Sequence, residues 1–265
     1  MISSTSNAKV KKAAALGKKA RYRRETGLFV VEGPRMVAEL PKEWIDSVYV
    51  TEPFLRTQTE AARRLKNLDC VETVTEDVLK AMSDTETPQG ILAIARQSRY
   101  EMKDVLRAQG KRHLIILETL QDPGNLGTII RTAEGAGASG IIMDRGTADI
   151  YNPKVIRSTM GAIFRMPFVY VDHLEESLKE LKQLGIRLYA AHLEGSKDYD
   201  REDYREDTGI LIGNEAKGLS GSAAAMADSC VKIPMAGKVE SLNAAVAASI
   251  LMFEVARQRR NLQKN

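Results

Sequence analysis

The sequence predicts an α/β protein of two units, the larger of which holds a mostly parallel sheet. Its 265 residues are enough for two hydrophobic cores of ordinary size. Short apolar runs alternate with helical segments along most of the chain, as in parallel strands covered by helices. Residues 97–112 are polar and of mixed charge, so we expect a linker there, an N-terminal domain over residues 1–96 and a C-terminal domain over residues 113–265.

The N-terminal segment is typical of a small α/β domain. Apolar runs rich in β-branched residues predict its strands, and amphipathic segments predict its helices. The expected elements, in order, are a basic helix near the start, a strand over residues 28–33, a helix from Pro34, a strand over 47–51, a helix over 59–68 and a strand over 90–96.

The C-terminal segment continues the alternation. Strands are expected over residues 113–118, 140–144, 166–171, 187–193, 209–214 and 230–235. Helices are expected over residues 125–137, 155–164, 173–185 and 222–227 and at the C-terminal end. Sheets of this kind bind ligands at the carboxyl ends of their strands. Residues 194–207 are acidic and aromatic without a clear period, so we interpret them as a surface loop.

Positive charge is concentrated at the start of the chain. The net charge is only +4, yet residues 1–24 hold eight basic and no acidic residues, which leaves the remainder net acidic. A basic segment of this kind suits RNA or DNA, because phosphate contacts release counterions and give affinity without sequence preference. A solvated helix face kept soluble by lysine is the alternative. The candidate RNA-binding residues are Lys9, Lys11, Lys12, Lys18, Lys19, Arg21, Arg23 and Arg24.

Other features narrow the class of protein. Cys70 and Cys230 lack the spacing of a zinc site or a disulfide framework, so we expect no metal and two small buried residues. His113, His173 and His192 are scattered, and we interpret them as structural. No apolar run approaches the roughly 18 to 20 residues of a membrane span, and the N-terminus lacks a signal-peptide core. We therefore expect a cytoplasmic protein without a membrane partner.

Two glycine-rich segments resemble nucleotide-binding loops in the wrong context. Residues 135–140, GAGASG, match G-x-G-x-x-G but follow a helix and precede a strand, the reverse of a dinucleotide-binding turn. Residues 213–220, GNEAKGLS, have the outline of a phosphate-binding loop, but Leu219 stands where the lysine is needed. A dinucleotide-binding enzyme is therefore a minor alternative, which thermal protection by a nicotinamide cofactor would reveal.

Three segments carry Gly, Asn or Pro at the carboxyl end of a predicted strand: residues 122–131, 211–220 and 232–249. In the first, Asp122 or Asn125 can cap a helix that carries Gly127 and Arg131 on one face. Space beside an arginine suits a bound phosphate or carboxylate, although an ordinary ion pair with Glu134 explains Arg131 equally well.

The third segment is a polar loop that becomes an alanine-rich helix. Ser241 is a candidate N-cap, and Ser241 and Asn243 can serve capping alone. Arg257, Arg259 and Arg260, in the last turns, suit either the helix dipole or a second basic contact.

These three segments, in this order, resemble the signature motifs of the SpoU/TrmH family of RNA 2'-O-ribose methyltransferases, in the SPOUT superfamily. The resemblance spans residues 114–258. The matching residues are Asn125, Gly127 and Arg131 in the first motif, Gly213, Asn214, Glu215 and Gly218 in the second, and Ile233, Pro234, Ser241, Leu242 and Asn243 in the third. The N-terminal part is similar to the family's substrate-binding domain, which resembles an RNA-binding ribosomal protein.

The resemblance implies a C-terminal trefoil-knot domain that binds S-adenosylmethionine in the knot, and a homodimer. It implies catalytic roles for Arg131, Asn125, Glu215, Ser241 and Asn243. It implies that the cofactor is held largely by main chain at Gly213, Asn214, Gly218, Ile233, Pro234, Met235 and Leu242. Ala216 departs from the family, which usually has glycine there; if position 216 needs a positive φ, the methyl group costs about 1 kcal/mol.

Methyl transfer to a ribose hydroxyl is an in-line displacement, so the enzyme must align the oxygen and stabilise its charge. A guanidinium stays protonated, so we expect Arg131 to stabilise the developing alkoxide and to bind phosphate. Glu215 is then either the base or a group that orients Arg131. Ribosomal RNA is the favoured substrate, with transfer RNA as one alternative and a non-catalytic RNA-binding or ribosome-assembly protein on the same fold as the other.

Overall fold

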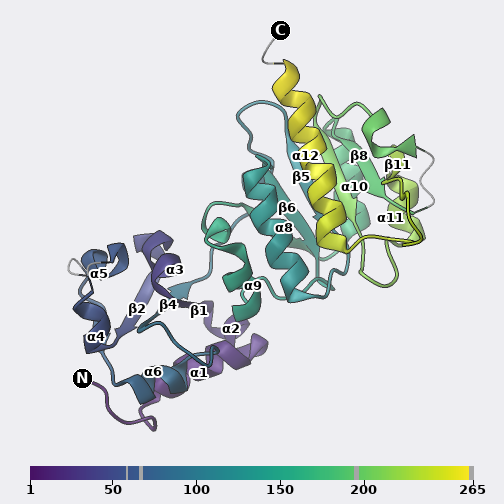
Figure 1. The fold of residues 1–265 in the computed structure, drawn as a ribbon. Coiled ribbons are helices and arrows are strands. Elements are labelled where there is room, and N and C mark those ends of the chain that lie inside the picture. Colours follow the sequence, from purple (N-terminus) through teal and green to yellow (C-terminus); the bar gives the residue numbers. More distant parts are fainter. Residues whose placement is uncertain (58, 66–67, 194–196, 263–265) are drawn as a thin grey trace. The chain divides into compact units, whose positions relative to one another are not determined.

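The structure is a computed structural model that describes residues 1–57, 59–65, 68–193 and 197–262. The chain forms two compact units (Figure 1). One comprises Met1–Arg99 and Asp149–Phe164, and the other comprises Tyr100–Ala148 and Arg165–Asn265. The predicted α/β class is confirmed, with a sheet in each unit.

The first unit contains a mixed four-stranded sheet in the order β1-β4-β2-β3. The strands are β1 (Leu28–Glu32), β2 (Ile45–Val50), β3 (Val71–Thr73) and β4 (Ile91–Arg96). Strand β4 runs antiparallel to both β1 and β2, whereas β2 and β3 are parallel. The short strand β3 was not predicted, because its three residues are all only partly buried and carry no apolar pattern.

Helices surround this sheet and complete its core. They are α1 (Ala8–Lys18), α2 (Ala20–Thr26), α3 (Pro34–Glu39), α4 (Glu52–Leu55), α5 (Glu60–Leu65) and α6 (Glu76–Met82), with a 3-10 turn η1 (Lys42–Trp44). Leu16 of α1 and Leu79 of α6 join Leu92 of β4 in one buried cluster. Residues 66 and 67 of the predicted helix over residues 59–68 lie outside the described residues.

The segment Asp149–Phe164 packs with this first unit, although it follows β6 of the second. It contains α9 (Pro153–Thr159) and the 3-10 turn η2 (Ala162–Phe164). The Tyr151 ring lies 4.6 Å from the Phe29 ring, and Asp149 accepts two hydrogen bonds from Arg23. An apolar helix pattern shows that a segment is buried but not against which sheet, so the sequence did not reveal this placement.

The second unit contains a sheet of seven parallel strands in the order β7-β6-β5-β10-β8-β11-β9. The strands are β5 (His113–Leu117), β6 (Gly140–Asp144), β7 (Phe168–Val171), β8 (Arg187–Ala191), β9 (Lys197–Asp198), β10 (Thr208–Ile212) and β11 (Ser229–Lys232). Strands β5 and β10 are buried throughout, as expected of central strands covered on both faces. The predicted parallel sheet is confirmed.

Helices cover both faces of this sheet (Figure 1). On one face, α7 (Met102–Val105), α10 (Leu174–Gln183) and α11 (Gly221–Met226) share a core with alternate residues of the central strands, such as Leu114 and Ile116. On the other, α8 (Pro123–Gly135) and α12 (Ala244–Leu262) lie side by side. No helix among the described residues is long and apolar enough to cross a membrane.

The expectation of a surface loop over residues 194–207 is only partly right for its described part; residues 194–196 lie outside it. Strand β9 pairs with β11, and a 3-10 turn η3 (Tyr199–Arg201) follows. The Tyr204 side chain is fully buried against the Tyr189 ring, 4.6 Å away. A tyrosine ring is buried readily when its hydroxyl finds a partner, and Tyr204 donates to the Tyr199 carbonyl.

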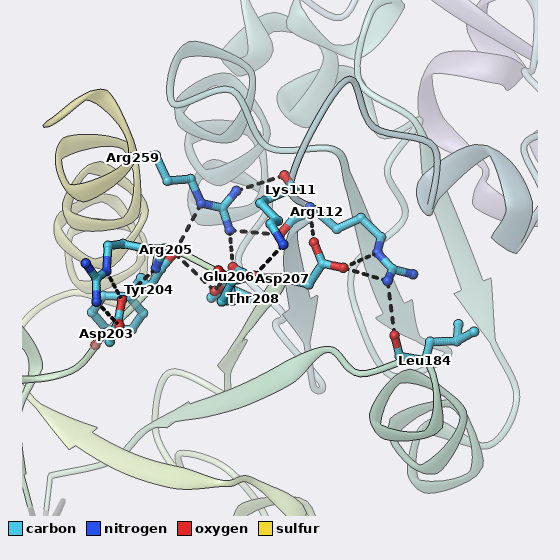
Figure 2. Close-up of polar contacts among 10 residues, drawn as sticks. All are labelled: Lys111, Arg112, Leu184, Asp203, Tyr204, Arg205, Glu206, Asp207, Thr208 and Arg259. Atoms are coloured by element: carbon cyan, nitrogen blue, oxygen red, sulfur yellow. Dashed lines mark hydrogen bonds and ion pairs between the residues drawn. The ribbon is translucent and has the colours of Figure 1, made fainter. Parts of the chain in front are cut away.

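The last helix is anchored at its C-terminal end by Arg259 (Figure 2). The Arg259 guanidinium donates hydrogen bonds of 2.7 to 3.1 Å to the main-chain carbonyls of Lys111, Arg112, Tyr204 and Glu206. The sequence is compatible with two roles for Arg259, a favourable interaction with the helix dipole or a second basic contact. The four hydrogen bonds to carbonyls explain its position without either role. Arg259 joins α12 to the amino ends of β5 and β10.

Candidate active site

The turn from β5 into α8 lies at the carboxyl edge of the parallel sheet. Asp122 is the N-cap of α8, because its carboxylate accepts a 2.8 Å hydrogen bond from the Asn125 main-chain N–H. Pro123 follows in the first turn, where a missing N–H costs nothing. The strands on either side of β5 end at the same edge, so their following segments converge on this turn.

Glu215, from the segment after β10, binds this turn directly. Its Oε1 accepts from the Asp122 N–H at 2.8 Å and from the Asn125 side-chain amide at 3.1 Å. Its Oε2 accepts from the Gln121 N–H at 3.1 Å. Partial burial raises the pKa of Glu215, but the hydrogen bonds from Asp122, Asn125 and Gln121 outweigh that effect and hold the pKa below its usual value. Glu215 is therefore an anion whose carboxylate is hydrogen-bonded to the start of α8.

Asn243 completes the junction from the third segment. Its side-chain amide donates to the Asn125 Oδ1 at 2.9 Å, while its own Oδ1 accepts from the Ala245 N–H at 2.9 Å and caps α12. The expectation that Ser241 is the N-cap is wrong, because α12 begins at Ala244 and the capping position falls on Asn243. One side chain, Asn125, thus joins all three sequence segments through Glu215 and Asn243.

The segment after β10 folds back on itself. Asn214 and Gly218 exchange main-chain hydrogen bonds of 3.0 and 2.9 Å, and Gly218 has a φ of 69°. A Cβ on Gly213 would lie 2.2 Å from the Gly218 carbonyl carbon, so only glycine fits there. Thr119 and Met160 are the only non-glycine residues with positive φ in the described part, so Ala216 is free of the expected strain.

The other expected cofactor residues follow β11. Ile233 and Leu242 are half-buried, whereas Pro234, Met235 and Ser241 are exposed. The Ser241 side chain forms no hydrogen bond with any described residue, and the same segment also exposes Lys238 and Glu240.

Arg131 stands apart from its neighbours on α8. Its side chain is exposed and forms no hydrogen bond or ion pair with any described residue. The alternative ion pair with Glu134 is wrong, because Glu134 pairs with Arg165 at 2.7 Å. Arg131 also has no contact of this kind with Glu215, so Glu215 does not orient it in this structure. The guanidinium is available to a ligand.

The basic segment at the start of the chain divides into paired and unpaired residues. Arg23 is only 2% exposed and binds Asp149, so the expectation that it contacts RNA is wrong. Three others form ion pairs: Lys9 with Glu72, Lys12 with Asp46 and Arg21 with Glu25. Exposed residues without an ion pair in the described chain are Lys11, Lys18, Lys19 and Arg24.

Thr119 and Asp144 also belong to this edge but were not singled out by the sequence analysis. The Thr119 carbonyl accepts a 2.9 Å hydrogen bond from the Asn214 side chain, and Asp144 binds Thr119. A threonine and an aspartate after apolar strands are too common to indicate such a role from sequence.

Two families match the chain, one in each part. Residues 112–253 match the SpoU rRNA Methylase family. Residues 7–93 match the MRM3-like substrate binding domain.

Curated relatives match over much or nearly all of the chain. The 23S rRNA (guanosine(2553)-2'-O)-methyltransferase RlmP of Bacillus subtilis is 33% identical over 254 residues, which cover 96% of this chain and 98% of the relative. The 23S rRNA (guanosine-2'-O-)-methyltransferase RlmB of Xanthomonas campestris pv. campestris is 33% identical over 208 residues, which cover 77% of this chain and 83% of that relative.

Solved structures share the fold over the full length. The SpoU methyltransferase AviRb from Streptomyces viridochromogenes, in complex with the cofactor AdoMet, has a TM-score of 0.85 at 30% identity and covers 96% of this chain and 98% of its own. An AdoMet-bound rRNA methyltransferase from Sinorhizobium meliloti has a TM-score of 0.84 at 35% identity and covers 97% of both chains.

Proposed function

We propose how this protein works from one premise: the chain belongs to the SpoU rRNA methylase family. It is an S-adenosylmethionine-dependent RNA 2'-O-ribose methyltransferase, with ribosomal RNA as its substrate class. The predicted family, reaction and cofactor are confirmed. The observation that carries this conclusion is the match to relatives of the same activity along the whole chain, substrate-binding domain included. The dinucleotide-binding alternative is wrong, because residues 135–140 join the end of α8 to the start of β6.

The backbone around Gly213 fits the cofactor. The close approach of Gly213 to Gly218 leaves no room for a side chain at Gly213, so a ligand at this loop meets main-chain groups, which suit the polar edge of an adenosine. When bound, S-adenosylmethionine supplies an electrophilic methyl group on its sulfonium. We assign its binding to Gly213, Asn214, Gly218, Ile233, Pro234, Met235 and Leu242.

We assign the transition-state charge to Arg131. The developing negative charge on the ribose oxygen needs a fixed cation, and a guanidinium can bind that oxygen and a neighbouring phosphate together. The absence of a described protein partner supports this role, because a paired arginine would first have to break its ion pair.

We assign Glu215 a positioning role and not the role of the base. A general base works best with a pKa near the working pH, whereas three hydrogen bonds lower the pKa of Glu215. Those bonds hold Asn125 and the first turn of α8, the helix that carries Arg131. Asn125 and Asn243 then fix the three segments together, and the exposed Ser241 is available to the ribose.

The finer partner assignments are also proposals. Exposed Lys11, Lys18, Lys19 and Arg24 suit RNA phosphates. Val246 and Phe253, each 47% exposed and seven residues apart on α12, leave an apolar face that suits a second copy of the chain in a homodimer. The trefoil knot and a cytoplasmic site of action remain proposals that rest on the family resemblance. So does the division into domains over residues 1–96 and 113–265 joined by residues 97–112, although the compact units differ from it, since Asp149–Phe164 packs with the first and Tyr100–Arg112 with the second.

Methyl transfer tests this function directly. Wild type and Arg131→Ala are incubated with labelled S-adenosylmethionine and either unmodified ribosomal RNA or transfer RNA, and the label is located by nuclease digestion and mass spectrometry. The expected result is label on one ribose of ribosomal RNA that the variant loses. Label on transfer RNA alone would contradict the substrate class. Cofactor binding without transfer to either RNA would favour an assembly intermediate as substrate, and absence of both would favour the non-catalytic alternative.

A further inference from the structure

Thr119 adopts a backbone conformation that its side chain disfavours. Its φ is 53°, in the left-handed region, where a branched Cβ crowds the main chain. Thr119 lies two residues after the end of β5 and three before the N-cap of α8. Strain of this kind persists only where surrounding contacts hold it, and it is concentrated at functional sites.

Asp144, the last residue of β6, supplies the contacts that hold Thr119. The Asp144 Oδ1 accepts from the Thr119 N–H at 2.8 Å, and Oδ2 accepts from the Thr119 hydroxyl at 2.7 Å. Thr147 donates to the same carboxylate at 2.7 Å and accepts from the Leu120 N–H at 3.3 Å. Gly146 leaves the space, since a Cβ there would lie 2.9 Å from the Thr119 hydroxyl oxygen.

The conformation of Thr119 determines where the active-site groups meet. The Thr119 carbonyl accepts from Asn214, and Asn214 in turn accepts from the Ala216 and Lys217 N–H groups of the cofactor segment. The next two N–H groups along the chain, beyond Leu120, donate to Glu215. A change of φ at Thr119 would redirect both sets of bonds at once.

We propose that Asp144 is a positioning residue for methyl transfer: its carboxylate holds Thr119 in the left-handed conformation and so fixes the first turn of α8 against the segment 213–218. This inference rests on the proposed function. Asp144 acts through Thr119, to which both of its carboxylate oxygens are bound. By fixing the first turn of α8, Asp144 also fixes the position of Arg131 relative to the reacting oxygen.

A double-mutant cycle tests this mechanism. Glycine adopts positive φ freely, so a chain with Thr119→Gly depends less on Asp144. Asp144→Ala is measured alone and in the Thr119→Gly background, in single-turnover methyl transfer at saturating S-adenosylmethionine and ribosomal RNA. We expect a rate loss of at least about tenfold with Thr119 present and of less than about threefold with Thr119→Gly, because misplacement of catalytic groups costs up to about a hundredfold.

Three further measurements separate positioning from general damage. The Kd for S-adenosylmethionine, by calorimetry, should change less than about threefold while the rate falls. Hydrogen exchange in the peptide over residues 118–126 should speed up in Asp144→Ala and be restored by Thr119→Gly. Asp144→Asn, which keeps one acceptor oxygen, should give an intermediate rate.

The outcomes are distinct. Equal losses in both backgrounds, or a loss of less than about twofold with Thr119 present, would overturn the proposal. If Asp144→Ala folds only with Thr119→Gly, the proposal is supported; if it folds in neither background, Asp144 serves the fold at large and the proposal fails. Lack of activity in the wild type would contradict the proposed function instead, and hydrogen exchange would still decide whether Asp144 holds Thr119.

Discussion

The charged groups at the two edges of the parallel sheet in the second unit differ in their hydrogen-bond partners. At the amino edge, Arg259, Arg112 and Asp207 all bind protein groups, including the four carbonyls around Arg259 (Figure 2). At the carboxyl edge, Glu215 and Asn243 both bind Asn125, and Arg131 has no described partner. The comparison teaches that Arg259, which donates to four main-chain carbonyls, holds the fold, whereas Arg131, which has no described protein partner, is available to a ligand.

The largest expected effect comes from Arg131. Arg131→Ala should lower the methyl-transfer rate about 10² to 10³-fold, because a fixed donor to the developing oxyanion is lost. Its thermal unfolding should match that of the wild type, since the side chain supports no described contact. Arg131→Lys is the control for charge without the planar fork, and a rate near that of the wild type would show that a bidentate guanidinium is not required.

Asn125 tests whether the carboxyl edge works as one junction. Asn125→Ala removes the side-chain bonds to both Glu215 and Asn243, so the three segments lose their common contact. We expect a rate loss of about 10 to 100-fold, with unfolding free energy lowered by about 1 to 2 kcal/mol. Steady-state kinetics and denaturant titration measure the two effects. Asn125→Asp, which cannot donate to Glu215, should be no better than alanine; full activity of either variant would contradict the junction.

Arg259 should show the reverse pattern. Arg259→Ala removes four hydrogen bonds to main-chain carbonyls at the amino edge, so we expect the unfolding free energy to fall by about 2 to 3 kcal/mol. The methyl-transfer rate per folded molecule should stay within about threefold of the wild type, because the anchor lies at the opposite edge from Arg131. Arg260→Ala, on the same turn and exposed, is the matched control. Equal destabilisation by both variants would contradict the claim that Arg259 anchors α12.

His113 gives the smallest effect and a pH signature. Burial, with a smaller contribution from the positive charge of Arg259, lowers the pKa of His113 to about 3. The unfolded chain takes up this proton near pH 6.5 and the folded chain does not, so stability falls as pH drops from 6.5 towards 3. At pH 5 the loss is about 2 kcal/mol.

Replacement of the imidazole should remove that part of the pH dependence. The His113 Nε2 is buried without a hydrogen-bond partner among the described residues, so His113→Leu removes an unpaired polar atom. Denaturant titration between pH 7 and pH 5 should therefore show a shallower loss for His113→Leu than for wild type. Parallel curves would show that His113 does not carry the acid sensitivity in this range, because carboxylates with lowered pKa values, such as Asp207 and Glu254, lose their contribution only below about pH 5.

The period of the apolar residues and the order of the strands predict much of the fold. Apolar runs placed the strands of the parallel sheet, and parallel strands bring their carboxyl ends to one edge. This reasoning predicts that the segments 122–131, 211–220 and 232–249 lie at one edge of the sheet, and hydrogen bonds of Asn125 with Glu215 and Asn243 join those segments. The family's motifs, not the residue pattern, supplied the reaction.

Other features depend on tertiary contacts that no local pattern encodes. Arg23 belongs to a basic run, yet an aspartate 126 positions later buries it. The positive φ of Thr119 contradicts the preference of a β-branched residue, and Asp144, 25 positions later, accepts hydrogen bonds from both its N–H and its hydroxyl. Tyr204 sits in an acidic stretch but completes the core beside Tyr189. In each case a distant partner outweighs the local propensity.

The most direct test of the contrast between the two edges is a side-by-side measurement of Arg131→Ala and Arg259→Ala. Single-turnover methyl transfer to unmodified ribosomal RNA and denaturant unfolding are recorded for both at a temperature where each is folded. The account predicts that Arg131→Ala is stable and nearly inactive, while Arg259→Ala is less stable and active. A stable, active Arg131→Ala, or an Arg259→Ala that loses activity without losing stability, would contradict it.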